Sequence, residues 1–395
     1  MTEITANPPP ELDNIGRRAL YVGVAGLLGG VIGWFLLGHE QFLRSYLLGF
    51  IFWIGIALGC LAILMVQHMS GGAWGLVIRR VLESATRTFP LMLVLFIPLA
   101  LGVKVLYEWA RPEVVAGNHL LEHKQAYLNI TFFLIRAAFY FLVWLTVSYF
   151  LNRWSLEQDR TGDSPLTRKL QMLSGPGILL YGLTVTFASV DWVMSLEPEW
   201  FSTIFGVLFM GGQGVSAMAF VIAVIVLLAR RRPLSEILAP RHLHDLGKLL
   251  LAFIMLWAYF AFSQFLIIWS GNLPEEVPYY VRRMQGPWKY LAVVVLLFHF
   301  ALPFVLLLSR DLKRNGRLLA MVAIGVIVMR FVDLYWTILP GFHHGEYHFN
   351  PLDFILPIGL GGIWVWFFIQ QLKGRPLIPI RDPALADALA HHEGH

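Results

Sequence analysis

The stretch SYLLGFIFWIGIALGCLAILMVQ, residues 45–67, contains no acidic or basic side chain. The hydrocarbon core of a bilayer is about 30 Å thick, and a helix needs about 20 apolar residues to cross it. Nine further stretches are similarly long and apolar. The sequence therefore predicts an all-α polytopic membrane protein with ten transmembrane helices, at 19–38, 45–67, 88–108, 126–151, 176–195, 203–229, 246–270, 288–308, 318–339 and 354–372.

The composition agrees with this fold class. Of the 395 residues, 57% are hydrophobic and only 14% are charged, which excludes an ordinary soluble domain. We expect one membrane domain at 19–372, with polar tails at 1–18 and 373–395. The longest connections are expected to be loops or surface helices, including an amphipathic helix at the membrane interface within 76–90; these connections are 68–87, 104–125 and 152–175.

The basic residues divide unequally between the two sides of the predicted membrane domain. Of the Lys and Arg residues, 21 fall on the side of the termini and 7 on the other side, while Arg136 and Arg330 lie inside spans. Loops rich in Lys and Arg stay in the cytoplasm, so we expect both termini to be cytoplasmic. This asymmetry explains the pI near 9.3 without a nucleic-acid partner.

The sequence offers few residues that hold a cofactor. One cysteine, Cys60, can form neither an internal disulfide nor an iron–sulfur or structural zinc site. A haem held between two helices usually needs two facing histidines, and only His299 lies deep in a span. We interpret the histidines of the 343–348 segment as solvated loop residues. We therefore expect no metal and no cofactor bound by this chain itself.

Ionisable residues inside spans are costly and usually have a partner. Arg330 and Asp333 are three residues apart and share one helix face, which predicts a salt bridge. Arg136 lies near the middle of its predicted span with no carboxylate on that span. Asp191 is the partner we expect, in a pair that joins two helices. The Arg330–Asp333 pair has two readings, a structural tie or part of a proton or quinone route. For Asp191, snorkelling toward the outer surface stays an alternative to the pair with Arg136.

His299 precedes Pro303 by four residues. Proline has no N–H to donate to the His299 carbonyl, so we expect a kink and an unpaired carbonyl beside the imidazole. Two interpretations stay open. The imidazole is either a satisfied core side chain or a hydrated, titratable site.

Four segments carry a family resemblance: FASVDWVMSLEPEWFSTIFGV at 187–207, GNLPEEVPYYVRRMQGPW at 271–288, FHFALPFVLLLSRDLKRNGRL at 298–318 and RFVDLYWTILP at 330–340. The chain resembles the F subunit of bacterial alternative complex III, a quinol oxidoreductase, over essentially all ten spans. This subunit belongs with the polysulfide-reductase-type membrane subunits. The resemblance implies two four-helix bundles, spans two to five and six to nine, flanked by spans one and ten. It also implies the bacterial inner membrane.

The resemblance further implies partners that carry the redox groups. These are a sister quinol-binding membrane subunit, an iron–sulfur subunit, and multihaem and monohaem cytochrome c subunits. We expect this chain to be a scaffold with a polar proton half-channel, not catalytic alone. A quinone ligand stays an open alternative with no residue assigned to it. The expected proton-path residues are Asp191, His299, Asp333, Arg330, Arg136, Tyr259 and Gln264.

Two other functions compete with this interpretation. In a stand-alone secondary transporter, the interrupted helices should occupy matching positions in the two halves of the chain. Here Pro98 and Pro303 interrupt spans three and eight, which match poorly. A purely structural assembly subunit has no need of charges deep in the membrane.

Overall fold

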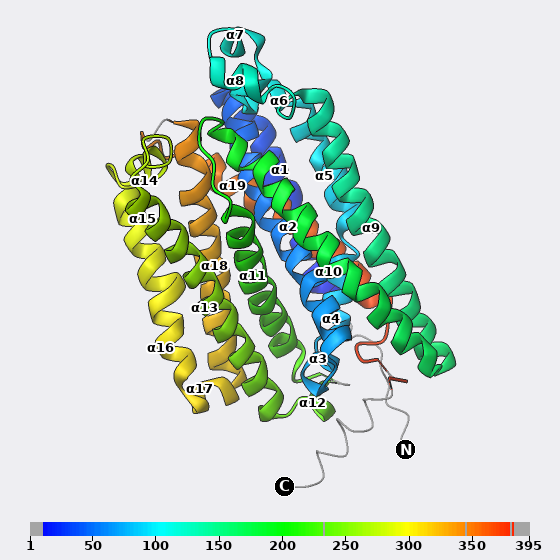
Figure 1. Cartoon of the computed structure of the whole chain (residues 1–395). Helices are drawn as coiled ribbons and strands as arrows, with labels where there is room; N and C mark the ends of the chain where they lie inside the picture. The colour runs from blue at the N-terminus through cyan, green and yellow to red at the C-terminus, as the bar shows by residue number, and fades with distance from the viewer. Residues whose placement is uncertain (1–10, 232–233, 344–345, 380, 383–395) are drawn as a thin grey trace.

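The computed structural model describes residues 11–231, 234–343, 346–379 and 381–382. Within these residues the regular structure is helical and no strand occurs. Ten helices are long and apolar enough to cross a membrane, which confirms the predicted all-α polytopic class. Figure 1 shows these helices running side by side between two ends of the molecule.

The ten membrane spans include two that are divided into shorter helices. The first five are α1 (Glu11–Leu37), α2 (His39–Ser70), α4 (Arg79–Thr86) with α5 (Phe89–Leu101), α9 (Ile130–Thr161) and α10 (Ser164–Trp192). The others are α11 (Phe205–Leu228), α13 (Pro240–Gly271), α15 (Trp288–Val294) with the π-helix η3 (Val295–Ala301) and α16 (Leu302–Leu308), α18 (Gly316–Phe342) and α19 (Leu352–Lys373).

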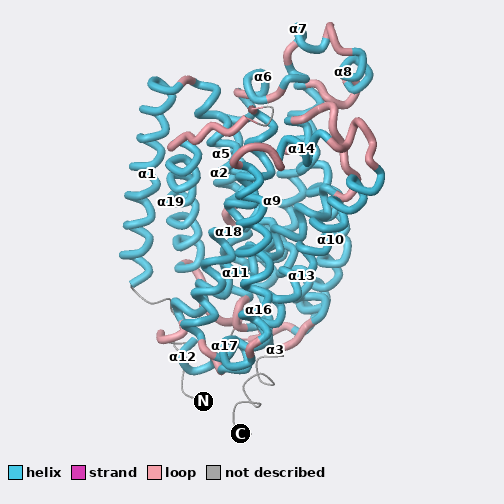
Figure 2. Tube along the Cα trace, turned by 90° about the vertical axis from the view of Figure 1, so that its left-hand side faces the viewer, coloured by secondary structure: helices cyan, strands magenta, loops and turns pink. Residues whose placement is uncertain are grey.

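Short helices connect the spans at both ends. At one end lie α6 (Val103–Leu106), η1 (Glu108–Ala110), α7 (Pro112–Val115), α8 (His119–Lys124), η2 (Met194–Leu196) and α14 (Pro278–Arg283). At the other end lie α3 (Ala73–Leu76), α12 (Leu234–Ile237) and α17 (Arg310–Arg314). Figure 2 shows the two groups at opposite ends of the helices. We call the first the loop end and the second the terminal end, because α1 begins there and α19 ends there.

The spans pack as two bundles. The first bundle contains α2, α4 with α5, α9 and α10, and the second contains α11, α13, α18 and the divided helix α15–η3–α16. Helices α2 and α10 contact α11, which joins the bundles, and α19 packs against α2 and α4. The arrangement has the order that the family resemblance implies.

Helices α1 and α19 form an antiparallel pair at the side of the first bundle. A Cβ atom on Gly26 would lie 2.5 Å from the Gly359 Cα, and one on Gly23 would lie 2.6 Å from the Ile363 nitrogen. Any larger residue would separate the two backbones. Glycine allows the close approach that drives helix association in lipid.

The helices extend beyond the predicted spans. Helix α1 begins inside the expected tail, and α9 and α10 occupy nearly all of the expected connection at 152–175. The reason is that polar residues at the ends of the spans have partners within the protein. Asn152 accepts from Arg375 at 2.7 Å, and Ser155 donates to Glu83 at 2.5 Å.

The segment expected as an interfacial amphipathic helix is instead interior. Helix α4 is buried along its whole length and leads directly into α5 as the start of the third span. Its charged face does not meet water, because Arg80 pairs with Glu83 at 2.5 Å and with Asp159. The amphipathic pattern was real, but its polar face packs against polar residues of α9.

Candidate functional site

The ionisable residues predicted inside spans fall into two groups, one in each bundle. Arg136 and Asp191 belong to the first bundle, whereas Arg330, Asp333 and His299 belong to the second. The two groups differ in how completely their polar atoms are bonded, and this difference decides what each can do.

The first-bundle pair joins α9 to α10. Arg136 Nε and Nη2 donate to the two oxygens of Asp191, both at 2.8 Å, and Tyr140 donates to the same carboxylate at 2.7 Å. The Arg136 Nη1 donates to the Tyr127 carbonyl at 2.9 Å. The predicted pair is therefore present. It lies near the loop end and not at the middle of the span, because α9 begins only at Ile130.

The second-bundle cluster is centred on α18. Arg330 donates to Asp333 three residues along the same helix, as predicted, and both side chains are buried. The guanidinium lies directly on α11, where a Cβ atom on Gly212 would come within 2.1 Å of its Cζ. It also faces the Phe209 ring at 5.9 Å. The glycine thus makes the space that the arginine occupies.

His299 completes this cluster from the π-helix η3. Its side chain is fully buried, its ring stands against Trp257 with centroids 4.4 Å apart, and neither ring nitrogen has a hydrogen-bond partner. The Trp257 indole lies beside both the His299 ring and the Asp333 carboxylate. Buried polar groups are rarely left without a partner, so the two ring nitrogens of His299 mark a place suited to water or a transferable proton.

The helix around His299 is irregular, as predicted, but the irregularity is a π-helical segment that precedes Pro303. The Leu302 N–H donates to Leu297, five residues earlier, and Pro303 follows immediately. Proline supplies no N–H, so the wider π-helical turn forms in the preceding residues. Single π-helical turns within longer helices are frequent at functional sites.

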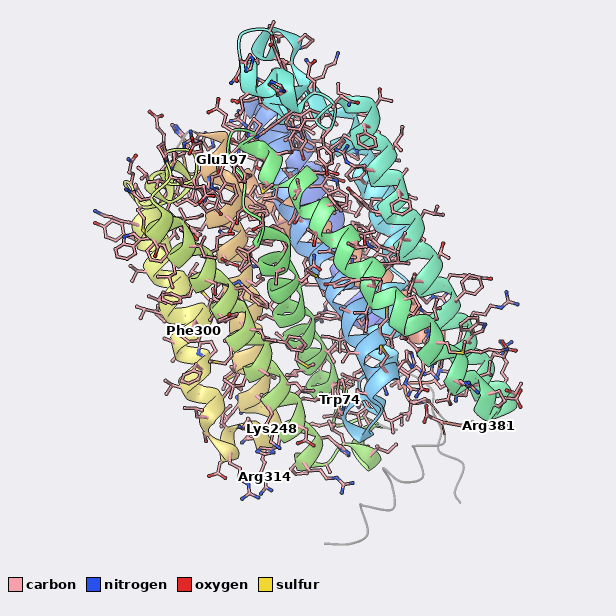
Figure 3. All side chains as sticks on the ribbon, viewed as in Figure 1. Trp74, Glu197, Lys248, Phe300, Arg314 and Arg381 are labelled. Atoms are coloured by element: carbon pink, nitrogen blue, oxygen red, sulfur yellow. The ribbon has the colours of Figure 1, made fainter. Side chains whose placement is uncertain are left out.

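A charged network leads from the loop end to this cluster. Glu197 accepts from Arg283 at 2.6 Å and from the part-exposed Arg282 at 2.9 Å. Arg283 also donates to the Thr337 carbonyl at 2.6 Å, and the Thr337 hydroxyl donates to the Asp333 carbonyl at 2.8 Å. Figure 3 places Glu197 close to the loop end. We call these residues the loop-end network.

Sequence reasoning missed this network. Arg282 and Arg283 are among the seven basic residues that the sequence placed on the side away from the termini, in a loop where charges are normally solvated, and Glu197 was given no role. The adjacent arginines within 271–288 were the available signal, since two neighbouring cations beside an aromatic pair suggest a buried carboxylate. Tyr279 covers Arg283, with the guanidinium carbon 3.5 Å from the ring centroid. Burial raises the pKa of Tyr279, so its phenol stays protonated.

Of the two uncharged residues predicted for the proton path, Gln264 is buried and Tyr259 is exposed. Gln264 is buried, accepts from Ser202 at 3.2 Å and contacts the Tyr280 hydroxyl at 3.3 Å. Burial raises the pKa of Tyr280 to about 12. Gln264 thus lies beside the loop-end network. Tyr259 is 65% exposed and lies on the outward face of α13, away from the buried residues it was expected to connect.

On the outward face of the second bundle, toward the terminal end, a groove of about 540 Å³ between α16 and α18 is lined by apolar residues, among them Pro303, Leu306 and Val322. The buried polar groups of the first bundle gather instead at the terminal end, around Glu83 and Arg375, which lie 3.0 Å apart. Burial, with the nearby Arg87 and Arg80 adding to it, lowers the pKa of Arg375 to about 10.

The described residues contain no group of three or more His, Cys, Asp or Glu side chains placed to hold a metal ion. The histidine-rich segment 343–348 is only partly covered by this statement, since His344 lies outside the described residues. Neither the models of known protein families nor the curated protein sequences give a significant match to this chain.

Proposed function

We propose that this chain is a membrane subunit of a quinol-oxidising respiratory complex of the bacterial inner membrane, and that its second bundle forms a proton half-channel. The observation that carries the half-channel is the loop-end network. Its bonds run inward as far as the backbone carbonyls of Thr337 and Asp333, and His299 with its unpartnered nitrogens lies beside Arg330 in the same cluster. In this proposal the route enters from the loop end and ends at His299.

Two side chains in this route can hold a proton. The carboxyl group of Asp333 and the imidazole of His299 both exchange protons, whereas Arg330 stays charged and sets the local field. Water beside the unpartnered nitrogens of His299 would connect the imidazole to Asp333, which lies beside the same Trp257 indole. Glu197 accepts bonds from Arg282 and Arg283 at the entrance of this route, near the loop end.

The redox chemistry belongs to partner subunits in this proposal. The resemblance of the four sequence segments to the F subunit of alternative complex III supports a sister quinol-binding subunit, an iron–sulfur subunit and cytochrome c subunits as partners. The unequal distribution of Lys and Arg between the two ends supports cytoplasmic termini, and the loop end is then the periplasmic side. A quinone bound by this chain itself is a separate hypothesis with no residue assigned to it.

The half-channel is tested in the native complex reconstituted into liposomes. Asp333→Asn and His299→Leu should assemble normally and lower the number of protons moved per quinol oxidised. Ser309→Ala, just beyond the end of α16 where the Ser309 hydroxyl accepts the Leu312 N–H at the start of α17, is the control at the terminal end and should keep the wild-type number. Normal assembly with an unchanged proton yield in both variants would reject the half-channel.

The assignment to a complex is tested separately by mild purification of the native protein. Multihaem cytochromes and an iron–sulfur protein should purify with it in fixed ratio. A chain that purifies alone and drives solute uptake in liposomes would favour the transporter function instead.

A further inference from the structure

A groove of about 720 Å³ lies at the terminal end of the first bundle, between α5, α9 and α19. Its lining changes along its length. Arg87, Arg153 and Gln371 line one part, and Leu145, Phe150 and Phe367 are among the residues that line the rest. The groove is separate from the second-bundle cluster and shares no residue with it.

The charged part lies at the boundary of the apolar region. Although α4 and the end of α9 continue the helices beyond it, the charge-free apolar runs of sequence stop beside it: one starts at residue 88, and the others end at 151 and 372. Arg87, Arg153 and Gln371 therefore stand at one level, where lipid headgroups meet the hydrocarbon region. Leu145 and Phe367 lie on the hydrocarbon side of that level.

The two arginines have no described carboxylate within salt-bridge distance. Arg87 donates through Nε to Gln371 at 2.7 Å, and Arg153 reaches only the Tyr149 hydroxyl at 3.4 Å. Two of the carboxylates nearby already have cations: Glu83 pairs with Arg80 and Arg375, and Asp382 pairs with Arg79 at 2.5 Å, while Glu157, one turn beyond Arg153 on α9, is exposed and forms no salt bridge with it. The groove therefore has a net positive charge at its headgroup level.

We propose that this groove binds an anionic phospholipid, of the phosphatidylglycerol class, from the leaflet at the terminal end. Its phosphate contacts the guanidinium groups of Arg87 and Arg153, and one acyl chain lies along Leu145 and Phe367. Arginine binds phosphate through two parallel hydrogen bonds, and basic pockets between helices at a membrane boundary select anionic headgroups. The Nε of Arg87 is used by Gln371, so its two terminal Nη groups are the donors that face the phosphate.

Such a lipid would stabilise the first bundle where three helices meet. Arg87 connects α4 and α5 and reaches α19 through Gln371, while Arg153 belongs to α9. A phosphate shared by both arginines would link these elements across the groove. A ligand that binds only the folded protein raises its melting temperature.

The experiment uses the full chain in detergent, titrated with phosphatidylglycerol or phosphatidylethanolamine, with bound lipid counted by native mass spectrometry. Wild-type protein should prefer phosphatidylglycerol. Arg87→Gln with Arg153→Gln should lower its affinity for phosphatidylglycerol by about 30-fold, about fivefold for each arginine. The matched control, Arg314→Gln with Arg317→Gln, removes the same charge elsewhere at the terminal end and should leave the affinity unchanged.

Two further variants separate the contributions of charge and shape. Arg87→Lys with Arg153→Lys should keep the preference for an anionic headgroup, whereas Thr146→Trp, which fills the groove without a charge change, should lower binding of both lipids. Inorganic phosphate should not compete, because it lacks the acyl chain. Equal affinity for the two lipids in the wild type, or an unchanged affinity in the Gln double variant, would overturn the proposal.

Discussion

Two of the buried arginine–aspartate pairs, Arg136–Asp191 in the first bundle and Arg330–Asp333 in the second, have arginines in similar sequence surroundings, LIRAAFYF at 134–141 and VMRFVDLYW at 328–336. In the first bundle, the Asp191 carboxylate accepts two bonds from Arg136 and one from Tyr140. In the second, the Asp333 carboxylate accepts a bond from Arg330 within the same helix, beside a histidine whose nitrogens make none.

The comparison shows that the same two residue types can serve different purposes. A carboxylate with all its bonds made holds two helices together, and it can accept a proton only by losing one of those bonds. A pair on one helix ties no neighbour, and open donors and acceptors beside it leave room for water. Bond saturation, and not the presence of charge, distinguishes the structural pair from the candidate proton site.

The largest expected effect is the loss of the first-bundle tie. Arg136→Met leaves Asp191 as a buried carboxylate without a cation, which should lower the free energy of unfolding by about 3–5 kcal/mol. Unfolding of the purified protein in mixed detergent measures this loss. The double variant Arg136→Met with Asp191→Asn should recover part of it. A double variant less stable than the single one would contradict the comparison.

Removing one donor to the same carboxylate should have a smaller effect. Tyr140→Phe deletes a hydrogen bond to a charged acceptor and should cost about 1.5–3 kcal/mol. The proton yield of the complex should not change, because Asp191 acts as a tie. The exposed Tyr21→Phe is the control for loss of a hydroxyl group. A reduced proton yield with unchanged stability would place Asp191 in the proton route, as the sequence first suggested.

The second-bundle cluster depends on a small residue in α11. Gly212→Ala forces the Arg330 guanidinium away from its place, and overpacking of this kind should cost about 1–3 kcal/mol. The matched control is Gly325→Ala on α18, where an added Cβ meets nothing within 4 Å. Thermal unfolding compares the two variants. Equal melting temperatures would contradict this prediction, because they would mean that the Arg330 side chain can move aside without loss of stability.

The smallest expected effect concerns Tyr259. Because this side chain is 65% exposed on the outward face of α13, Tyr259→Phe should change the free energy of unfolding by less than about 0.5 kcal/mol. The proton yield should equal that of the wild type. Gln264→Leu is the informative comparison, since Gln264 is buried next to Tyr280. A proton defect in the Tyr259 variant alone would move the route to the outward face.

The spans were predictable because hydropathy over about 20 residues is a local property. The Arg136–Asp191 pair was predictable by elimination, since few carboxylates lie in spans. The ends of the helices were not, because Asn152 and Ser155 look like loop residues until Arg375 and Glu83, distant in sequence, are placed beside them.

The loop-end network shows the same limit. Hydropathy assigns Arg283 and Glu197 to solvated loops, and only the folded chain brings Tyr279 over the arginine and the Thr337 carbonyl beneath it. The exposure of Tyr259 likewise depends on which face of α13 meets α11. A pattern along one helix does not state which neighbour each face will meet.

The glycine contact between α1 and α19 has a consequence for biosynthesis. Helix α1 ends at Leu37 and its partner begins only at Leu352, so α1 enters the membrane long before its partner exists. At a translation rate of about 5–20 residues per second, the wait is roughly 15–60 s. During that time the glycine face of α1 meets lipid or an insertion factor. Helix α1 can therefore form its close glycine contact only after residues 352–373 have been made, later than the helices between them.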